Sequence, residues 1–255
     1  MKKRIIPISL LLICVVITNP TFCQDAQQPF SNAQTRDSLV SIYRNTIERA
    51  DRLYSGTEYM GYVKRPKGHP FFLSDQFQPA ALSFEGTIYR DSILYDLVDD
   101  ALIIRDRGGE YNIKMVDDKV RWFELDNHQF VRVDSFASAS VQIAAGYYEQ
   151  LYSGTLQALV RHKKQINSHT VQSEVQSEYA QYDTYFIRRG DGYFRVVNTK
   201  SLLDALGEHR NEVRHFLYNQ HLNFKKDPAN TIRLAATFYD EQSTKLNDDK
   251  KSRLK

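Results

Sequence analysis

Short runs of Tyr, Phe, Ile and Val recur about every ten residues between positions 57 and 133, and this spacing constrains the fold more than any other feature. Asp, Asn and Gly separate the runs and suit tight turns. A parallel strand pair needs a return path of about a dozen residues, which no connection from position 81 onward provides. The pattern therefore predicts an antiparallel meander. The predicted strands are 58–62, 81–89, 92–98, 101–105, 110–115, 119–125 and 128–133, with turns at 90–91, 99–100, 106–109, 117–118 and 126–127.

A row of short antiparallel strands leaves unpaired edges that must be protected. We therefore expect the meander to curl into a barrel, a half-barrel or a sandwich, and the sequence does not select among the three. Residues 134–145 are rich in Ser and Ala and form a connection.

Residues 146–197 predict two further hairpins, which cover 147–163 and 185–197. In each, an aromatic and apolar run leads into a glycine-containing turn, at 153–154 and at 189–192. The polar stretch 165–181 between the hairpins predicts a mobile loop with room for a short helix.

Helices are predicted at both ends of the sheet. Before it, apolar residues recur at three- and four-residue spacing from Leu39 to Tyr54, and Gly56 offers a stop. After it, Asn198 or Thr199 caps a helix that ends near Gly207. A second and a third helix follow, and residues 243–255 are expected to fray. Val213, Phe216 and Leu217 mark the second helix; Asp227-Pro228 starts the third, with Ile232, Ala235, Ala236 and Tyr239 facing inward.

The expected fold class is therefore α+β, with one β-rich domain over residues 36–242. Within it, the meander covers 57–133, the two hairpins lie in 146–197, and the helical end covers 199–242.

Residues 1–23 have the order of a secretory signal peptide. The cationic cluster Met1 to Arg4 precedes an apolar run from Ile5 to Ile17, and Pro20 interrupts any helix soon after. The run is shorter than the roughly 20 residues of a membrane-spanning helix. We expect cleavage before Gln24 and a flexible arm over 24–35, with no transmembrane segment in the mature chain.

The alternative reading makes Cys23 a lipid-anchored N-terminus, but the bulky Phe22 before it is unusual for that modification. Cys14 and Cys23 are the two cysteines of the chain, and both lie in the leader. Cleavage before Gln24 leaves no thiol, so a disulfide, a thiol nucleophile and a cysteine-bound metal are excluded. The 34 basic residues fall to 31 when the three cations of the leader are removed, equal to the 31 acidic residues, and nucleic acid is not an expected partner.

The segment Gly68-His69-Pro70-Phe71-Phe72-Leu73-Ser74-Asp75, with Tyr95-Asp96-Leu97-Val98 and 102–106, resembles an uncharacterised family of exported proteins from Bacteroidota. The C-terminal segment 222–228 is similar to that family's end as well. The resemblance implies a location in a Gram-negative cell envelope, in the periplasm or at the outer membrane. It implies no reaction, ligand or functional residue.

The segment around His69 is the candidate ligand site. It is too irregular for a strand, and its aromatic residues with a few polar neighbours can line a pocket. The alternative is that its aromatic side chains plug one end of the sheet. The candidate ligand-binding residues are His69, Phe71, Phe72, Asp75, Gln76 and Phe77.

Signatures of catalysis and of metal binding are missing from the sequence. It contains no Gly-x-Ser-x-Gly, no His-Glu-x-x-His and no glycine-rich phosphate loop. His209, His215 and His221 are spaced by six residues, which places them on different sides of a helix. We therefore expect no cofactor and no metal site, and no catalytic residue is identified.

These observations favour a non-enzymatic envelope protein that binds an apolar or amphipathic ligand or a partner protein. The first alternative is an envelope hydrolase with a site near His69 and Asp75. The second is a structural subunit of an envelope assembly.

The export prediction is tested by the intact mass of the protein isolated from its native cells. We expect the mass of a chain that starts at Gln24, because the leader is removed on export. An acylated Cys23 would identify the lipid-anchored alternative, and an unprocessed chain in the cytosol would contradict export.

Overall fold

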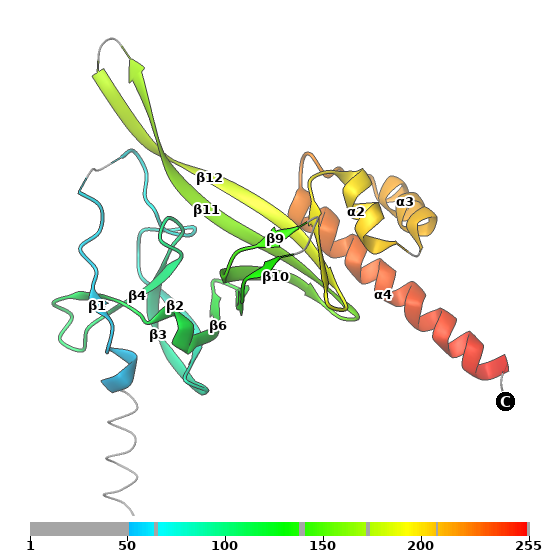
Figure 1. Cartoon of the computed structure of the whole chain (residues 1–255), viewed down its shortest axis with the longest axis horizontal. Coiled ribbons are helices and arrows are strands. Elements are labelled where there is room, and N and C mark those ends of the chain that lie inside the picture. Colours follow the sequence, from blue (N-terminus) through cyan, green and yellow to red (C-terminus); the bar gives the residue numbers. More distant parts are fainter. Residues whose placement is uncertain (1–50, 64–65, 138–140, 172–173, 208, 254–255) are drawn as a thin grey trace, which may run out of the picture. The chain divides into compact units, whose positions relative to one another are not determined.

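The predicted antiparallel meander is confirmed, and it continues further than expected into one eleven-stranded sheet (Figure 1). The computed structural model describes residues 51–63, 66–137, 141–171, 174–207 and 209–253. Strands β1 and β13 are the two ends of the sheet and do not pair with each other, so the sheet is not a closed barrel. The order is β1-β5-β4-β3-β2-β6-β7-β10-β11-β12-β13, with β1 Thr57–Glu58, β2 Gln78–Phe84, β3 Thr87–Asp96, β4 Ala101–Arg105, β5 Asn112–Lys114, β6 Val120–Leu125, β7 His128–Val133, β10 Gly146–Ser153, β11 Leu156–Val171, β12 Glu174–Arg189 and β13 Gly192–Val196.

The first tight turn of the sheet lies elsewhere than predicted. Strand β3 runs without interruption through positions 90–91, where a turn was expected. The chain reverses instead at Glu85 and Gly86, whose φ angles of 48° and 78° are both positive. Two successive positive φ angles match the twist of a two-residue hairpin, and Gly86 adopts this conformation without steric cost. The predicted turns at 99–100, 106–109, 117–118 and 126–127 are confirmed.

The predicted mobile loop at 165–181 is wrong, because residues 165–171 and 174–181 belong to the two longest strands. β11 and β12 pair in one unbroken register from Leu156 opposite Arg189 to Val171 opposite Glu174. The expected hairpins 147–163 and 185–197 are thus the two sides of a continuous four-stranded meander. The stretch is polar because both of its faces are largely exposed, not because its backbone is irregular.

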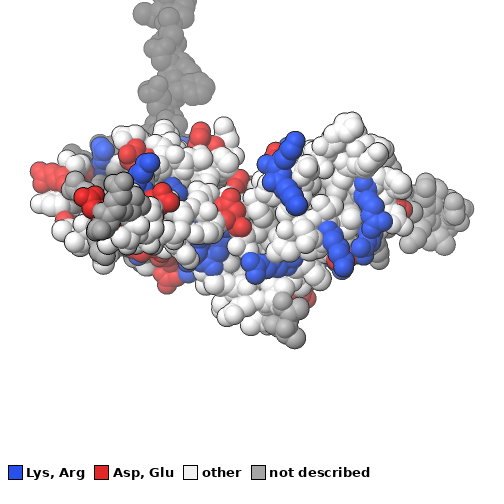
Figure 2. Space-filling view, turned by 90° about the horizontal axis from the view of Figure 1, so that it is seen from above, with Lys and Arg blue, Asp and Glu red and all other residues white. Residues whose placement is uncertain are grey.

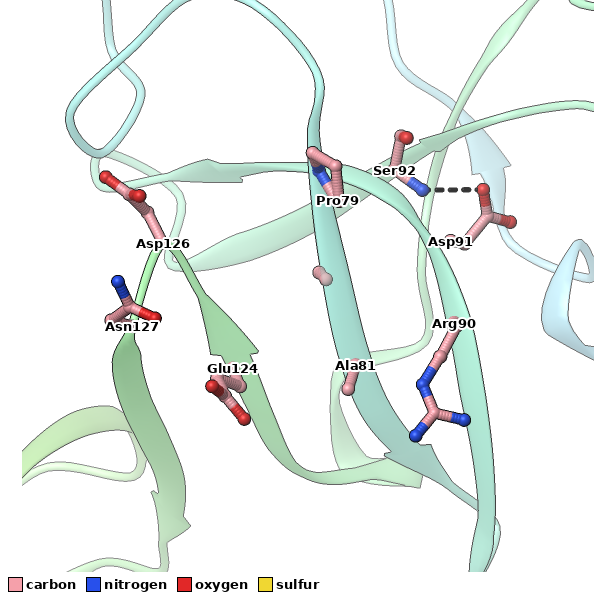
Figure 3. A pocket seen from close by; sticks show the side chains of 9 residues that line it. Pro79, Ala81, Arg90, Asp91, Ser92, Glu124, Asp126 and Asn127 are labelled. Carbon is pink, nitrogen blue, oxygen red and sulfur yellow. Dashed lines mark hydrogen bonds between the residues drawn. The ribbon is translucent and has the colours of Figure 1, made fainter.

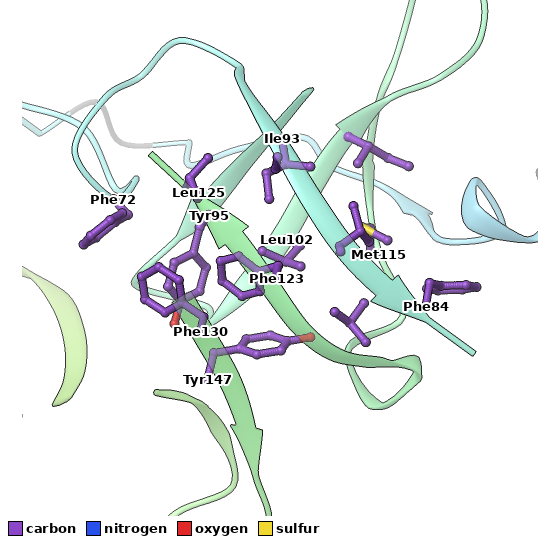
Figure 4. Close-up of a cluster of buried hydrophobic side chains, with 14 of the residues drawn as sticks. Phe72, Phe84, Ile93, Tyr95, Leu102, Met115, Phe123, Leu125, Phe130 and Tyr147 are labelled. Carbon is purple, nitrogen blue, oxygen red and sulfur yellow. The ribbon is translucent and has the colours of Figure 1, made fainter. Parts of the chain in front are cut away.

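The main hydrophobic core lies under β2, β3, β4, β6 and β7 (Figure 4). Aromatic rings fill its centre, with Phe123 and Phe130 stacked at a centroid distance of 4.6 Å and Tyr95 edge-on to both. Figure 4 shows Tyr147 beside these rings and Phe72 at the periphery. The space that a barrel-shaped carrier would leave for a ligand is here occupied by side chains.

The predicted C-terminal helices are confirmed. They are α2 Thr199–Leu206, α3 Arg210–Asn219 and α4 Pro228–Arg253. The side chain of Asn198 caps α2 by accepting a hydrogen bond from the Ser201 amide at 2.9 Å. The four residues expected to face inward from the third helix are all buried against the sheet.

Two predictions about the chain ends need comment. Helix α4 continues without a break to Arg253, and the expected fraying of residues 243–255 stays a prediction. The signal peptide, the arm at 24–35 and most of the predicted N-terminal helix lie outside the described residues. Residues 51–53 are helical, and Leu53 is buried in the main core. The connection 134–145 contains a small separate sheet of β8 Phe136–Ala137 and β9 Gln142–Ile143.

The core predicts a large effect for Phe123→Ala. Phe123 is fully buried and contacts three other aromatic rings, so truncation to Ala should lower the free energy of unfolding by about 3–5 kcal/mol. Urea denaturation measures this change. Ile88→Ala is the matched control, because Ile88 is exposed on neighbouring β3 and its loss should cost no more than about 0.5 kcal/mol. Equal effects of the two substitutions would contradict the assigned core.

Candidate functional site

The segment that contains His69 lies against the end of β3. The Phe72 amide donates to the Tyr95 carbonyl at 2.8 Å, and the Leu97 amide donates to the Pro70 carbonyl at 3.0 Å. Lys164 reaches across from β11, and its Nζ donates to the carbonyls of His69 and Phe71 at 3.0 and 2.7 Å. These contacts fix the backbone of the segment to two separate parts of the sheet.

The six candidate ligand-binding residues fall into two groups. The rings of His69 and Phe71 stack with centroids 6.3 Å apart, and Phe72 is buried in the main core next to them. Asp75 and Gln76 are exposed and bond to each other, while Phe77 lies beneath the guanidinium of Arg105. Ligand binding by these six residues stays a prediction.

Phe72 packs against a group of polar residues that the sequence analysis did not predict. Its ring packs against the imidazoles of His128 and His162, at centroid distances of 5.1 and 5.2 Å. Glu149 lies between these two histidines. Its Oε1 is 2.6 Å from Nδ1 of His128, and its Oε2 is 2.7 Å from Nε2 of His162.

The contacts continue across the sheet to a second carboxylate. Nδ1 of His162 lies 2.8 Å from Oδ1 of Asp183, which also accepts a hydrogen bond from Gln181 at 3.0 Å. We call His128, Glu149, His162 and Asp183 the carboxylate–histidine chain. Its members come from β7, β10, β11 and β12, and the side chains at its centre, Glu149 and His162, are 12% and 9% exposed.

The carboxylate–histidine chain holds His162 in its cationic form. Burial by itself lowers the pKa of His162, but hydrogen bonds to Asp183 and Glu149 outweigh burial and raise it to about 9. Burial alone raises the pKa of Glu149, yet its hydrogen bonds to the two histidines lower it below the usual value. The pKa of Asp183 is lowered by His162 in the same way, against the effect of burial. At neutral pH Glu149, His162 and Asp183 are therefore ionised.

The geometry of the chain suits a structural role better than a chemical one. Both ring nitrogens of His162 are engaged by carboxylates, so neither is free for a metal or a proton transfer. Among the described residues no group of three His, Cys, Asp or Glu side chains is arranged to hold a metal ion.

One ring nitrogen of His128 takes no part in the carboxylate–histidine chain. His128 lines a cleft of about 450 Å³ that is also lined by Arg233 of α4. A His–Glu pair of this kind orients a general base. A covalent mechanism also needs a nucleophile, and Ser, Thr and Cys are absent from the residues that line this cleft.

A larger depression, of about 600 Å³, lies over β2, β3 and β6 (Figure 3). Ala81 lies in its floor, and Figure 3 shows Arg90 on one side and Glu124 with Asp126 on the other. The depression is open and mixes both signs of charge. Its charged lining does not suit an apolar ligand.

Sequence reasoning missed the carboxylate–histidine chain because no short motif joins its members. They lie 13 to 55 residues apart and meet only when four strands pair in one register. The usable signal is the pairing of β11 with β12, whose register places His162 opposite Asp183. The predicted loop at 165–181 concealed that pairing.

Comparisons of the chain with known protein families, with curated proteins and with solved structures find no match. Within the described residues, none of the helices combines the length and the apolar character needed to cross a bilayer.

The raised pKa of His162 predicts a pH-dependent stability. The unfolded imidazole titrates near 6.5 and the folded one at about 9, so its contribution is complete below pH 6.5 and is lost as the pH rises through 9. We expect the free energy of unfolding to fall by about 3 kcal/mol between about pH 6.5 and about pH 9.

Denaturation by urea at a series of pH values measures this slope, and His162→Gln should remove it between about pH 7 and about pH 9. His169→Gln is the control, because His169 is exposed on the same strand and its loss should leave the slope unchanged. A level wild-type curve would show that His162 is not held as a cation.

Proposed function

We propose that the protein is an exported, non-enzymatic binding protein of the cell envelope that holds a partner protein through the outer half of the β11–β12 hairpin. We define the outer half as residues 165–171 and 174–181. The observation that supports this proposal is that most of the two strand edges of the outer half have no backbone partner among the described residues (Figure 1).

The neighbouring strands cover only the base of the hairpin. β10 pairs with β11 from Gln157 to Val160, and β13 pairs with β12 from Tyr185 to Arg189. Beyond these points, three backbone hydrogen bonds join the hairpin edges to other described residues. The Lys164 amide donates to the Leu97 carbonyl, the Lys67 amide donates to the Ser177 carbonyl, and the Tyr179 amide donates to the Lys67 carbonyl. The rest of both edges has no backbone partner in the part of the chain that the structure describes.

An exposed ribbon of this length is unusual without a partner. Two strands by themselves are only marginally stable in water, and long free edges invite pairing with another chain. Apolar side chains are exposed on the ribbon as well, with Val175 73% and Tyr182 47% accessible. A partner that adds an extended strand to one edge would satisfy the free backbone groups and cover these side chains.

The two other functions considered are less well supported. The core is filled by aromatic rings, which leaves little room for an apolar ligand there. A hydrolase near His69 and Asp75 needs the carboxylate to orient the imidazole. Nδ1 of His69 is instead buried with no side-chain hydrogen-bond partner among the described residues, and Oδ1 of Asp75 accepts from Gln76. A structural subunit of an envelope assembly would use the same hairpin and is a special case of the proposal.

The proposal predicts a position-dependent cross-link in native cells. A photo-activated side chain in place of Val175 should form one discrete adduct with another protein, because this position lies on the proposed contact surface. The same side chain in place of Ile88, which is 59% exposed on β3, should form none.

A shortened hairpin tests the same surface by a second route. Replacement of residues 166–179 by Asn-Gly joins Gln165 to Ala180, which already face each other in the register. A cross-linker in place of Tyr182 should then lose its adduct while the melting temperature changes little. The proposal is wrong if Val175 and Ile88 give the same result, or if the shortened protein keeps its adduct.

A further inference from the structure

The sheet of β10 to β13 has a second face, opposite to the carboxylate–histidine chain, and a cleft of about 330 Å³ opens on it. Successive residues of a strand point to opposite faces. His162 therefore lies on the face that carries the carboxylate–histidine chain, while Arg161 and Lys163 lie on the opposite face and line the cleft. From β12, Thr184 and Tyr182 lie opposite these two cations in the register.

The charges around this cleft are all of one sign. Arg161, Lys163 and Arg195 line it, and none of its lining residues is acidic. Arg161 is neutralised by Asp100, at 2.9 Å. Lys163 and Arg195 form no ion pair or hydrogen bond with any described side chain, so two cations beside the cleft have no counter-charge from the part of the chain that is described.

The remaining lining residues suit an organic ligand. The rings of Tyr148 and Phe186 are buried in the floor, and Tyr182 stands half-exposed in the wall. The amides of Gln142 and Gln165 offer neutral hydrogen-bonding groups. Pockets that bind small molecules combine such apolar surfaces with a few polar groups that fix the orientation of the ligand.

The depression in Figure 3 provides the contrast within the same molecule. Its cation, Arg90, is accompanied by Asp91, Glu124 and Asp126, so it carries no excess of positive charge. On the face shown in Figure 2, charges of both signs lie over the left-hand half, whereas Lys and Arg predominate over the right-hand half.

We propose that the cleft lined by Lys163, Arg195 and the rings of Tyr148, Tyr182 and Phe186 binds a small organic anion, an aromatic carboxylate or phosphate ester. Lys163 and Arg195 supply charge-assisted hydrogen bonds to the acidic group. The rings take the apolar part. Nε of Arg161 is a buried donor that has no acceptor among the described residues. The cleft lies on one face at the base of the hairpin and shares Gln165 and Tyr182 with the partner surface proposed above.

Calorimetric titration of the protein purified after expression of the full-length chain tests the site, with phenyl phosphate as the probe. Phenyl phosphate should bind at one site, more tightly than inorganic phosphate, which lacks the ring, and phenol, which lacks the charge. The double variant Lys163→Gln with Arg195→Gln should weaken binding about tenfold or more. The control, Arg90→Gln with Arg121→Gln, removes as much charge elsewhere and should stay within about twofold of the wild type.

A second probe identifies the source of the anion. Vesicles of phosphatidylcholine with phosphatidylglycerol present the same acidic group on a lipid. Vesicle binding that the double variant loses assigns the site to a lipid headgroup, and binding of phenyl phosphate alone assigns it to a soluble anion. The proposal is overturned if phenyl phosphate does not saturate a site, if phenol binds equally well, or if both double variants bind like the wild type with unchanged melting temperatures.

Discussion

The contact between Glu149 and His162 is the one on which the rest of the sheet depends, because it joins the two parts of the meander at a buried position. Glu149 also reaches His128 on β7, and His162 reaches Asp183 on β12. Four strands thus share one series of charge-assisted hydrogen bonds, which are about twice as strong as neutral ones. Breaking such a series by removing one partner costs about 3–5 kcal/mol, because it leaves a buried charge unpaired. A single substitution here therefore affects strands that are distant in sequence.

A second buried carboxylate holds the segments that pass outside the sheet. Asp96, fully buried at the end of β3, accepts hydrogen bonds from the hydroxyls of Tyr59 and Tyr62 at 2.7 and 2.8 Å. It thereby fastens a stretch whose own strand, β1, has only two residues. Together with Lys164, which holds the backbone at His69 and Phe71, this contact fixes the base of the long hairpin from one side. The rigid part of the hairpin therefore ends where these polar contacts end, and the ribbon beyond depends on its own cross-strand pairs.

Local patterns predicted the elements whose structure is determined by a few neighbouring residues. Asn198 and the Asp227-Pro228 pair locate helix starts because capping involves groups within one turn. The same reasoning failed at Glu85-Gly86, because Arg90-Asp91 is an equally good turn pair and only the pairing of β2 with β3 decides between them. Local patterns also fail at 165–181, where the polar composition predicts a mobile loop. A strand that is exposed on both faces has no apolar alternation, so its sequence alone does not distinguish it from a loop.

The same limit explains why the candidate site was predicted only in part. His69, Phe71 and Phe72 are adjacent in sequence and were recognised together, whereas His162 acquires its role from strands β10 and β12 on either side. Strand alternation then gives the hairpin two separate uses. Even-numbered positions of β11, such as His162 and Lys164, hold the fold together, while Arg161 and Lys163 between them face an open cleft. Because neighbouring residues point to opposite faces, the cleft residue Lys163 can change without disturbing the contacts that hold the sheet.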